Sequence, residues 1–206
     1  MRTALQGLYV ITDRALMGAD LLTQAEQAIA GGARLLQYRD KDSNSVQRQQ
    51  QAGALAQLCR QHGVIFIIND EPTLAVNVDA DGVHLGQTDG DIHSARRVLG
   101  ADKIIGVTCH ASLKAALAAE KAGADYVAFG RFFPSQTKPD APPAEIDILQ
   151  QARRKLAIPI VAIGGITPDN GGALIASGAD MLAVIHGIFG AGNVRAATRQ
   201  YVELFG

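Results

Sequence analysis

The chain has 206 residues, 48% of them hydrophobic, so it can bury a substantial core and is not a disordered protein. Its formal net charge of −1 excludes a polybasic surface of the kind that binds nucleic acid, so an anionic substrate must be held by a few local cations. No apolar run reaches the roughly 18 residues of a membrane span, and the first residues do not have the pattern of a signal peptide. Cys59 and Cys109 have neither CxxC nor metal-ligand spacing, which favours two reduced, buried thiols. We therefore expect a cytoplasmic protein that binds neither nucleic acid nor membranes.

Short apolar runs alternate along the chain with Ala-rich segments of helical character. The runs are almost continuously hydrophobic, as expected for parallel strands that are buried on both faces. We predict strands at 8–11, 35–38, 65–68, 82–85, 104–107, 126–129, 158–163 and 181–185. We predict helices at 21–30, 46–62, 113–122, 144–156, 168–176 and 194–205, with shorter ones near Thr73 and Ile92.

Eight strands that alternate with about eight helices favour a closed (β/α)8 TIM barrel, in which residues 1–206 form a single catalytic domain. An open doubly wound sheet is the second choice, but no G-x-G-x-x-G pattern follows the first strand. Similar Gly-containing joins precede the second, fourth, sixth and eighth strands, on the face of a barrel where residues usually serve stability. These joins are 31–33, 81–82, 122–125 and 177–180.

Polar residues that follow the strands would converge on one mouth of such a barrel. After the second strand, Arg39 and Lys41 are two residues apart, so an extended backbone could point both cations at a diphosphate. An ordinary charged surface loop would show the same pattern. Asp70 and Asp89 follow the third and fourth strands, which are neighbours. Such a pair could hold Mg²⁺ together with a diphosphate, or Asp70 could cap a short helix that begins near Pro72 while Asp89 lies in an exposed turn.

The later strand ends offer further candidates for phosphate binding. After the fifth strand, Thr108 could hydrogen-bond a ligand, whereas His110 more often starts or caps the next helix. A long Pro-rich loop at 133–143 could fold over the mouth as a lid and places Lys138 among hydroxyl side chains. The Gly-rich stretches 164–170 and 186–190 follow the seventh and eighth strands, where barrels of this kind often bind phosphate through backbone N–H groups.

Together these motifs resemble those of the thiamine phosphate synthase family. The resemblance covers nearly the whole chain, the motifs occur in family order, and the stretches that carry it are 37–41, 69–70, 82–89, 135–138 and 163–166. The GVHLGQTD and SQTK stretches are specific, whereas IGGI occurs in many barrels. Tyr38, Thr108 and His186 depart from the residues common in the family, which are Leu, Ser and Ser.

The resemblance implies a role for each matching position. Residues implied to contact a pyrimidine diphosphate are Gln37, Tyr38, Arg39, Asp40, Lys41, Asn69, Thr108 and Lys138, of which Arg39, Lys41 and Lys138 would be catalytic. Residues implied to contact a thiazole phosphate are Ser135, Gln136, Thr137, Gly165, Ile185 and His186. Asp70 and Asp89 would bind Mg²⁺.

The implied reaction joins 4-amino-2-methyl-5-pyrimidinylmethyl diphosphate to a (carboxy)methylthiazole-ethyl phosphate, giving thiamine phosphate and pyrophosphate. A thiazole tautomerase, which is a related barrel, is an alternative, but it would need an acid/base and would lack the full diphosphate–metal set. A non-catalytic phosphate-binding barrel is a third interpretation. The sequence leaves the oligomeric state open, a homo-oligomer included.

Overall fold

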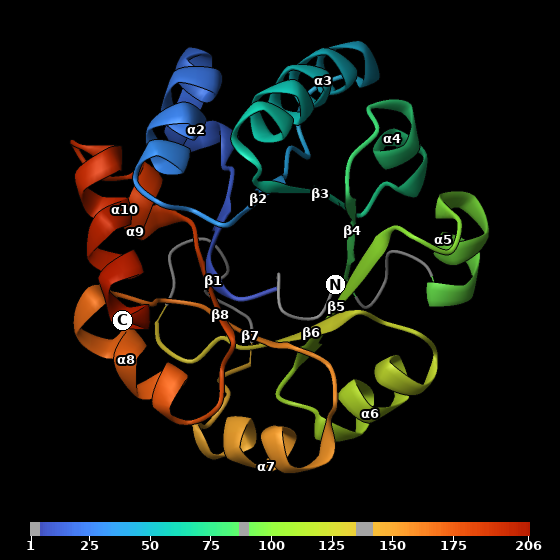
Figure 1. Ribbon diagram of the computed structural model, residues 1–206, viewed down its shortest axis with the longest axis vertical. Helices are drawn as coiled ribbons and strands as arrows, with labels where there is room; N and C mark the ends of the chain where they lie inside the picture. Colours follow the sequence, from blue (N-terminus) through green and yellow to red (C-terminus); the bar gives the residue numbers. More distant parts are fainter. Residues whose placement is uncertain (1–4, 87–90, 135–141) are drawn as a thin grey trace.

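The computed structural model describes residues 5–86, 91–134 and 142–206, and it shows a closed barrel of eight parallel strands. Figure 1 shows the strands as an inner ring with helices arranged around them. Each strand pairs with the next along the chain, and the first pairs with the eighth, so no sheet edge is left open. The predicted (β/α)8 barrel is thereby confirmed, and the open doubly wound sheet is excluded.

The strands agree closely with those predicted from the apolar runs. They are β1 (Gly7–Ile11), β2 (Leu35–Tyr38), β3 (Ile65–Asn69), β4 (Gly82–Leu85), β5 (Ile104–His110), β6 (Tyr126–Phe129), β7 (Ile160–Ile163) and β8 (Met181–Val184). β5 is three residues longer than predicted because a register shift between Thr108 and His110 lets it continue its pairing with β6. β7 begins two residues later than predicted, directly after Pro159, which cannot donate to a strand ladder.

The helices follow the strands in the alternation that the sequence indicates. They are α1 (Arg14–Met17), α2 (Leu21–Ala30), α3 (Ser45–His62), α4 (Pro72–Asn77), α5 (Ile92–Leu99), α6 (Leu113–Lys121), α7 (Asp147–Lys155), α8 (Pro168–Ala176), α9 (His186–Phe189) and α10 (Val194–Val202), with short 3-10 turns at 18–20 and 203–205. α7 begins three residues later than predicted because the N–H of Ala144 donates to the carbonyl of Arg131 instead of joining the helix. No described helix is both long enough and apolar enough to traverse a bilayer.

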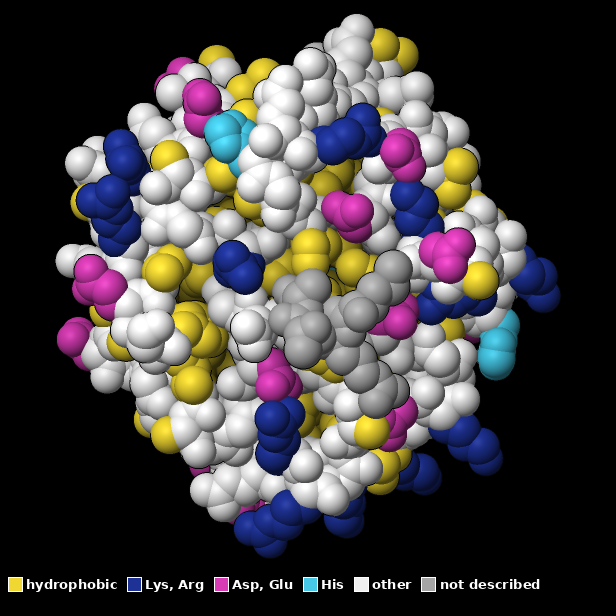
Figure 2. Space-filling view, viewed as in Figure 1, with side chains coloured by type: hydrophobic (Ala, Val, Ile, Leu, Met, Phe, Trp, Pro, Cys, Tyr) yellow, Lys and Arg dark blue, Asp and Glu magenta, His cyan; other side chains and the backbone are white. Residues whose placement is uncertain are grey.

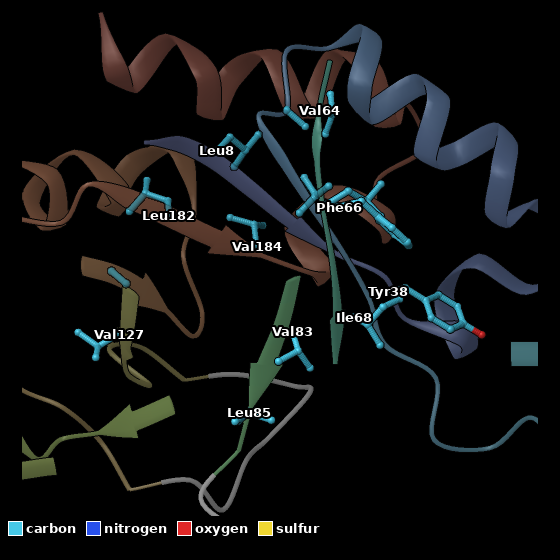
Figure 3. Close-up of a cluster of buried hydrophobic side chains, with 14 of the residues drawn as sticks. Leu8, Tyr38, Val64, Phe66, Ile68, Val83, Leu85, Val127, Leu182 and Val184 are labelled. Atoms are coloured by element: carbon cyan, nitrogen blue, oxygen red, sulfur yellow. The ribbon is translucent and has the colours of Figure 1, made fainter. Parts of the chain in front are cut away.

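Two layers of apolar side chains hold the barrel together. The outer layer lies between strands and helices, and Figure 3 shows part of it, with side chains such as Leu8, Phe66 and Leu182. The inner layer fills the bore and includes Tyr9, Leu35, Ile67, Tyr126 and Met181. Because successive residues of a strand point to opposite faces, one run of four or five apolar residues supplies both layers.

Carboxylates at the amino ends of the strands hold neighbouring strands in register. Asp81, Asp125 and Asp180 precede β4, β6 and β8, and each accepts a hydrogen bond from a backbone N–H at the start of the preceding strand, over 2.7, 2.8 and 2.9 Å. Arg96 and Arg153 pair with the last two of these carboxylates. The repeated Gly-containing joins that hold these three aspartates therefore serve stability, as predicted.

The charged side chains are distributed without a single dominant sign. On the face that Figure 2 shows, Lys and Arg side chains are interleaved with Asp and Glu. This distribution agrees with the net charge of −1. An anionic ligand must therefore be bound by individual cations close to its site and not by the overall charge of the protein.

Candidate active site

A cavity of about 360 Å³ opens at the carboxyl ends of the strands, and all eight strands contribute to its lining. It brings together most of the predicted site residues that the structure describes. Those in its lining are Gln37, Arg39, Lys41, Asn69, Asp70, Thr108, Gly165, Ile185 and His186. Asp89, Ser135, Gln136, Thr137 and Lys138 lie outside the described residues, and Tyr38 and Asp40 do not line the cavity.

Asp40 shapes the loop that follows β2. Its carboxylate accepts hydrogen bonds from the N–H groups of Asp42 and Ser43, over 2.9 and 3.0 Å, and from the Ser43 hydroxyl over 2.6 Å. Burial opposes the charged form, but these hydrogen bonds outweigh it and hold the pKa of Asp40 below its usual value. The side chain thus fixes the turn, and only the backbone of Asp40 remains a candidate ligand contact.

Hydrogen bonds to Thr12 fix the backbone at the start of the loop that carries the two cations. Thr12, just after β1, accepts a hydrogen bond from the Arg39 N–H over 2.9 Å and donates to the Arg39 carbonyl over 3.3 Å. Tyr38 points the other way, into the layer between strands and helices (Figure 3). Its hydroxyl donates to Gln51 of α3 over 2.8 Å. Arg39 and Lys41 therefore share one wall of the cavity, as the alternation predicts.

Asp70 faces the cavity from a backbone conformation that is uncommon for a residue with a side chain. Its φ is 62°, in the left-handed region that Asp and Asn tolerate best. One carboxylate oxygen accepts from the Gly86 N–H over 3.2 Å, and the other accepts from the Asn69 amide over 2.5 Å and lies 3.3 Å from Lys41 Nζ. Asp70 does not cap α4, whose N-cap is Glu71, so the helix-cap alternative is wrong.

Thr108 and His110 both line the cavity from the end of β5. Strand alternation turns these two residues to the same space, and buried Cys109 between them packs in the outer layer. The expectation that His110 starts or caps the next helix is wrong, because Ser112 caps α6 and accepts from the Ala115 N–H over 3.1 Å. The signal that could have identified His110 as a cavity residue is its position two residues after Thr108, on the same face of the strand.

The glycines after β7 are required by the segment that follows β6. At Gly165, where φ is 63°, an added Cβ would lie 2.3 Å from the carbonyl oxygen of Pro134. Gly164, at φ 103°, would place a Cβ 2.3 Å from that of Arg131. The N–H of Phe133 donates to the Gly164 carbonyl over 3.0 Å, so the loops after β6 and β7 are joined along their backbones.

The loop after β8 lies beside these glycines. Ile185 precedes the short helix α9, and His186 is its first residue and lines the cavity together with Gly187. Asn170 stabilises the turn before α8, since its side-chain oxygen accepts from the Thr167 N–H over 2.8 Å. The backbone after β7 and β8 thus lines the cavity three and two strand positions around the barrel from β2, whose loop carries Arg39 and Lys41.

Three buried polar residues of the site were not predicted. Tyr9, His84 and Tyr126 lie inside the bore and connect Gln37 to Thr108 through hydrogen bonds of 2.7, 2.9, 2.9 and 2.8 Å, in the order Gln37, Tyr9, Tyr126, His84, Thr108. We call these five residues the interior polar chain. A polar side chain at an inward position of an apolar strand is the signal that could have found them, because a buried polar group needs a partner.

The fold and the cavity define a class of protein. A closed barrel with cations at one part of its mouth, a carboxylate beside them and Gly-rich loops at another part is suited to binding two phosphorylated small molecules. Within the part of the chain that the structure describes, no three His, Cys, Asp or Glu side chains gather into a metal-binding group. Asp70 is the predicted metal ligand that can be placed, and its partner Asp89 is not described.

Comparison with known proteins assigns the family. A family model described as thiamine monophosphate synthase matches residues 8–188, which include every strand except the first residue of β1. The chain belongs to the thiamine monophosphate synthase family, and it is accordingly a transferase of thiamine biosynthesis.

Individual relatives agree with this assignment over almost their whole length. The thiamine-phosphate synthase of Alcanivorax borkumensis is 53% identical over 205 residues, covering 98% of this chain and 94% of that protein. That of Thioalkalivibrio sulfidiphilus is 50% identical, with 98% and 96% covered. Among solved structures, thiamine phosphate pyrophosphorylase from Pyrococcus furiosus is 37% identical, with a TM-score of 0.90 and with 98% and 96% covered.

Proposed function

We propose that the cavity joins 4-amino-2-methyl-5-pyrimidinylmethyl diphosphate to a (carboxy)methylthiazole-ethyl phosphate and releases thiamine phosphate and pyrophosphate, together with CO2 when the thiazole carries the carboxyl group. The observation that carries this assignment of substrates to residues is that Arg39 and Lys41, beside Asp70, line the cavity at the ends of β2 and β3, whereas Gly165 and His186 line it at the ends of β7 and β8. A site with two separate phosphate-binding walls suits two phosphorylated substrates that react between them. A single phosphate monoester would need one wall alone.

The pyrimidine diphosphate is proposed to bind along the wall of Arg39 and Lys41. Arg39 can donate to phosphate oxygens in a bidentate manner, and Lys41 can follow the charge with a flexible side chain. The side chains of Gln37, Asn69 and Thr108 lie deeper in the same cavity and are proposed to contact the ring. Lys138 is proposed to reach the diphosphate from the loop after β6, and the backbone at Tyr38 and Asp40 to complete the wall.

Mg²⁺ is proposed to bind between Asp70, Asp89 and the diphosphate. Asp70 fits this role, because its carboxylate faces the cavity on a constrained backbone and lies beside the cation wall. Hard oxygen ligands and water are what Mg²⁺ prefers, and one or two carboxylates with substrate phosphates form a typical site for it. When bound, the metal would supply charge neutralisation for the leaving diphosphate.

The thiazole phosphate is proposed to bind at the loops after β6, β7 and β8. Gly165 allows an anion to approach the backbone closely, and the N–H groups around Ile185 and His186 can donate to phosphate oxygens. Ser135, Gln136 and Thr137 are proposed to complete this wall. Because Gly165 contacts the backbone of Phe133 and Pro134, thiazole-phosphate binding and the position of that loop are expected to depend on each other.

The proposed chemistry needs charge stabilisation more than proton transfer. The C–O bond between the pyrimidinylmethyl carbon and the diphosphate breaks, both electrons leave with the pyrophosphate, and the thiazole nitrogen forms the new C–N bond with its lone pair. The amino group of the pyrimidine can stabilise the carbocation character at the methylene carbon, so bond breaking can run ahead of bond formation. Arg39, Lys41 and Lys138 would then stabilise the negative charge that develops on the leaving group.

One assay tests the proposed reaction. The purified protein is incubated with both substrates and Mg²⁺, and thiamine phosphate and pyrophosphate are measured together. Equal amounts of the two products are expected. Pyrophosphate without thiamine phosphate would indicate hydrolysis, and isomerisation of the thiazole phosphate alone would support the tautomerase alternative.

The domain organisation, the cellular compartment and the partners of the protein are part of the same proposal. We propose that residues 1–206 act as one catalytic domain, since strands from both ends of the chain, β1 and β8, pair to close the barrel. Cys59 and Cys109 are free buried thiols, which suits the reducing cytoplasm. The partners are the small phosphorylated substrates.

A further inference from the structure

The hydrogen atoms along the interior polar chain can be assigned one by one from its Gln37 end. The Gln37 amide nitrogen can only donate, so the Tyr9 oxygen accepts from it. Of the two partners of the Tyr9 hydroxyl, only the Tyr126 oxygen can accept, so the hydrogen of Tyr9 goes there. The Tyr126 oxygen thus accepts from Tyr9, and the hydrogen of Tyr126 goes to Nδ1 of His84. With Nδ1 accepting, a neutral imidazole carries its hydrogen on Nε2 and donates it to Thr108. The bonds therefore all run in one direction, from β2 to β5.

The environment of the chain keeps this direction stable. Burial raises the pKa of both Tyr9 and Tyr126, so both phenols keep the hydrogen that the sequence of bonds needs. The two tyrosine side chains are fully buried, and the rings of His84 and Tyr126 are stacked with centroids 5.5 Å apart. In a low-dielectric interior, a reversed or broken bond would leave a donor or an acceptor without a partner, which is costly.

Gly106 makes the link between β4 and β6 possible. In the strand register, Gly106 stands between His84 and Tyr126 on the barrel wall. A Cβ at Gly106 would lie 1.9 Å from the Cζ atom of Tyr126, so any side chain there would displace the tyrosine ring. The absence of a side chain lets the Tyr126 hydroxyl cross β5 and reach the histidine.

The two ends of the chain are left with opposite hydrogen-bonding characters toward the cavity. Gln37 uses its amide nitrogen on Tyr9, and among the described residues none donates to its side-chain oxygen, so this end offers an acceptor. Thr108 accepts from His84, and its hydroxyl hydrogen has no acceptor among the described residues, so this end offers a donor. Both side chains line the cavity.

We propose that Tyr9, Tyr126 and His84 are positioning residues that set the polarity of the cavity floor and thereby select the ring of the substrate. The acceptor at Gln37 suits the exocyclic amino group of an aminopyrimidine, and the donor at Thr108 suits a ring nitrogen. A ring with an oxo group and a protonated ring nitrogen presents the reverse pattern and is rejected. This inference deepens the proposed function, on which it rests for the identity of the ring.

The direction of the chain can be read without an activity assay. The tautomer of His84 is measured by ¹⁵N NMR on the full-length protein, with His84→Asn used to assign its signals among the five histidines. We expect the Nε2–H tautomer in the wild type. In Tyr126→Phe, Nδ1 loses its donor, and we expect the Nε2–H signal to be lost or mixed with the other tautomer. An Nδ1–H tautomer in the wild type would overturn the proposed direction.

A matched variant separates this effect from the general loss of a buried tyrosine hydroxyl. Tyr201→Phe removes a buried hydroxyl that donates to the Ile166 carbonyl over 3.0 Å, outside the bore. Its cost in folding stability should resemble that of Tyr126→Phe. Its His84 tautomer should be that of the wild type. If Tyr201→Phe changes the tautomer as much as Tyr126→Phe does, the chain is not the cause.

Substrate discrimination tests the functional half of the proposal. The probe is the 4-oxo analogue of the pyrimidine diphosphate, in which the amino group is replaced by an oxo group, and its inhibition constant is compared with the KM of the amino substrate. We expect the wild type to bind the oxo analogue roughly 10- to 100-fold less tightly, and Tyr126→Phe to narrow that ratio toward one. The KM for the thiazole phosphate should change little in the same variant. Unchanged discrimination in a folded Tyr126→Phe would overturn the proposal.

The two readouts also distinguish this inference from the proposed function. If the protein forms no thiamine phosphate, the proposed function fails, while the His84 tautomer still reports the direction of the chain. If the protein is active and His84 carries its hydrogen on Nδ1, the proposed function stands and the polarity proposal fails.

Discussion

Lys41 Nζ lies 3.3 Å from Oδ2 of Asp70, so the cation proposed for the diphosphate and the carboxylate proposed for the metal pair with each other between the ends of the neighbouring strands β2 and β3. The Lys41 side chain is 55% exposed and that of Asp70 is 17% exposed. A partly exposed ion pair of this kind contributes little net stability. The pair can therefore separate at small cost when a metal and a diphosphate bind, and until then it keeps both side chains at the site.

The Asp70 carboxylate leads us to expect that activity requires a divalent cation. Excess chelator should abolish turnover, and Mg²⁺ should restore it. Asp70→Asn keeps a residue that tolerates the left-handed backbone but removes the charge, so it should raise the Mg²⁺ concentration for half-maximal rate about 10- to 100-fold. The matched control is Asp79→Asn, because Asp79 also has a positive φ, of 51°, and pairs with cations at the opposite end of the barrel. Full turnover in chelator with no metal retained would contradict the prediction.

Lys138→Ala should remove most of the turnover and leave the fold intact. The loss of one charge-assisted contact to the leaving group should raise the barrier by about 2–4 kcal/mol, which is roughly 30- to 1000-fold in rate. Single-turnover rates measure the effect, and Lys114→Ala, at an exposed position of α6, is the control for loss of a lysine. An unchanged rate in Lys138→Ala would show that the side chain does not act on the leaving group.

Gly165→Ala should strongly raise the KM for the thiazole phosphate, with a smaller effect on the pyrimidine diphosphate. A single methyl group would meet the Pro134 carbonyl oxygen at 2.3 Å, so the loops after β6 and β7 would have to move apart and the backbone proposed to bind the anion would shift. Gly172→Ala is the control, since a Cβ there meets nothing within 4 Å.

The companion variant His186→Ser should be mild, because a backbone contact to the phosphate would survive it. The two glycine variants and His186→Ser are compared by the KM for each substrate and by circular dichroism. A harmless Gly165→Ala beside an inactive His186→Ser would identify His186 as an acid or base and would favour the tautomerase alternative.

Asp40→Asn should loosen the loop that carries Arg39 and Lys41. The side chain of Asp40 is 2% exposed, and its charge-assisted hydrogen bonds should be worth on the order of 1–3 kcal/mol of unfolding free energy. Since the folded-state pKa of Asp40 is lowered, this contribution is present above the unfolded-state pKa of about 4 and is lost as the pH falls through the folded-state value.

Urea unfolding of the wild type and of Asp40→Asn measures this difference at several pH values. We expect a clear gap in stability at pH 7 that closes as the pH is lowered below about 4. A gap that is independent of pH would show that the carboxylate charge does not stabilise the loop.

The barrel and much of its mouth could be predicted from local sequence patterns. An apolar run of four to six residues indicates a strand that is buried on both faces. The residue that follows the run lies at the carboxyl end of that strand, independently of the rest of the sequence. Arg39, Asp70 and Gly165 could therefore be assigned to one mouth once eight such runs had been counted. The family resemblance also assigned Tyr38 and Asp40 to the site, but their side chains make hydrogen bonds away from the cavity.

What the sequence determined by itself was the order of strands and helices, the closed barrel, and the set of charged residues at the strand ends, because each of these depends on periodicity along the chain. Tertiary structure alone decided which residues touch across the bore. The register shift between β5 and β6, the space that Gly106 leaves for Tyr126, and the contact of Gly165 with Pro134 all arise between strands or loops that are distant in sequence. Such contacts are set by packing in three dimensions, and no local pattern of residues records them.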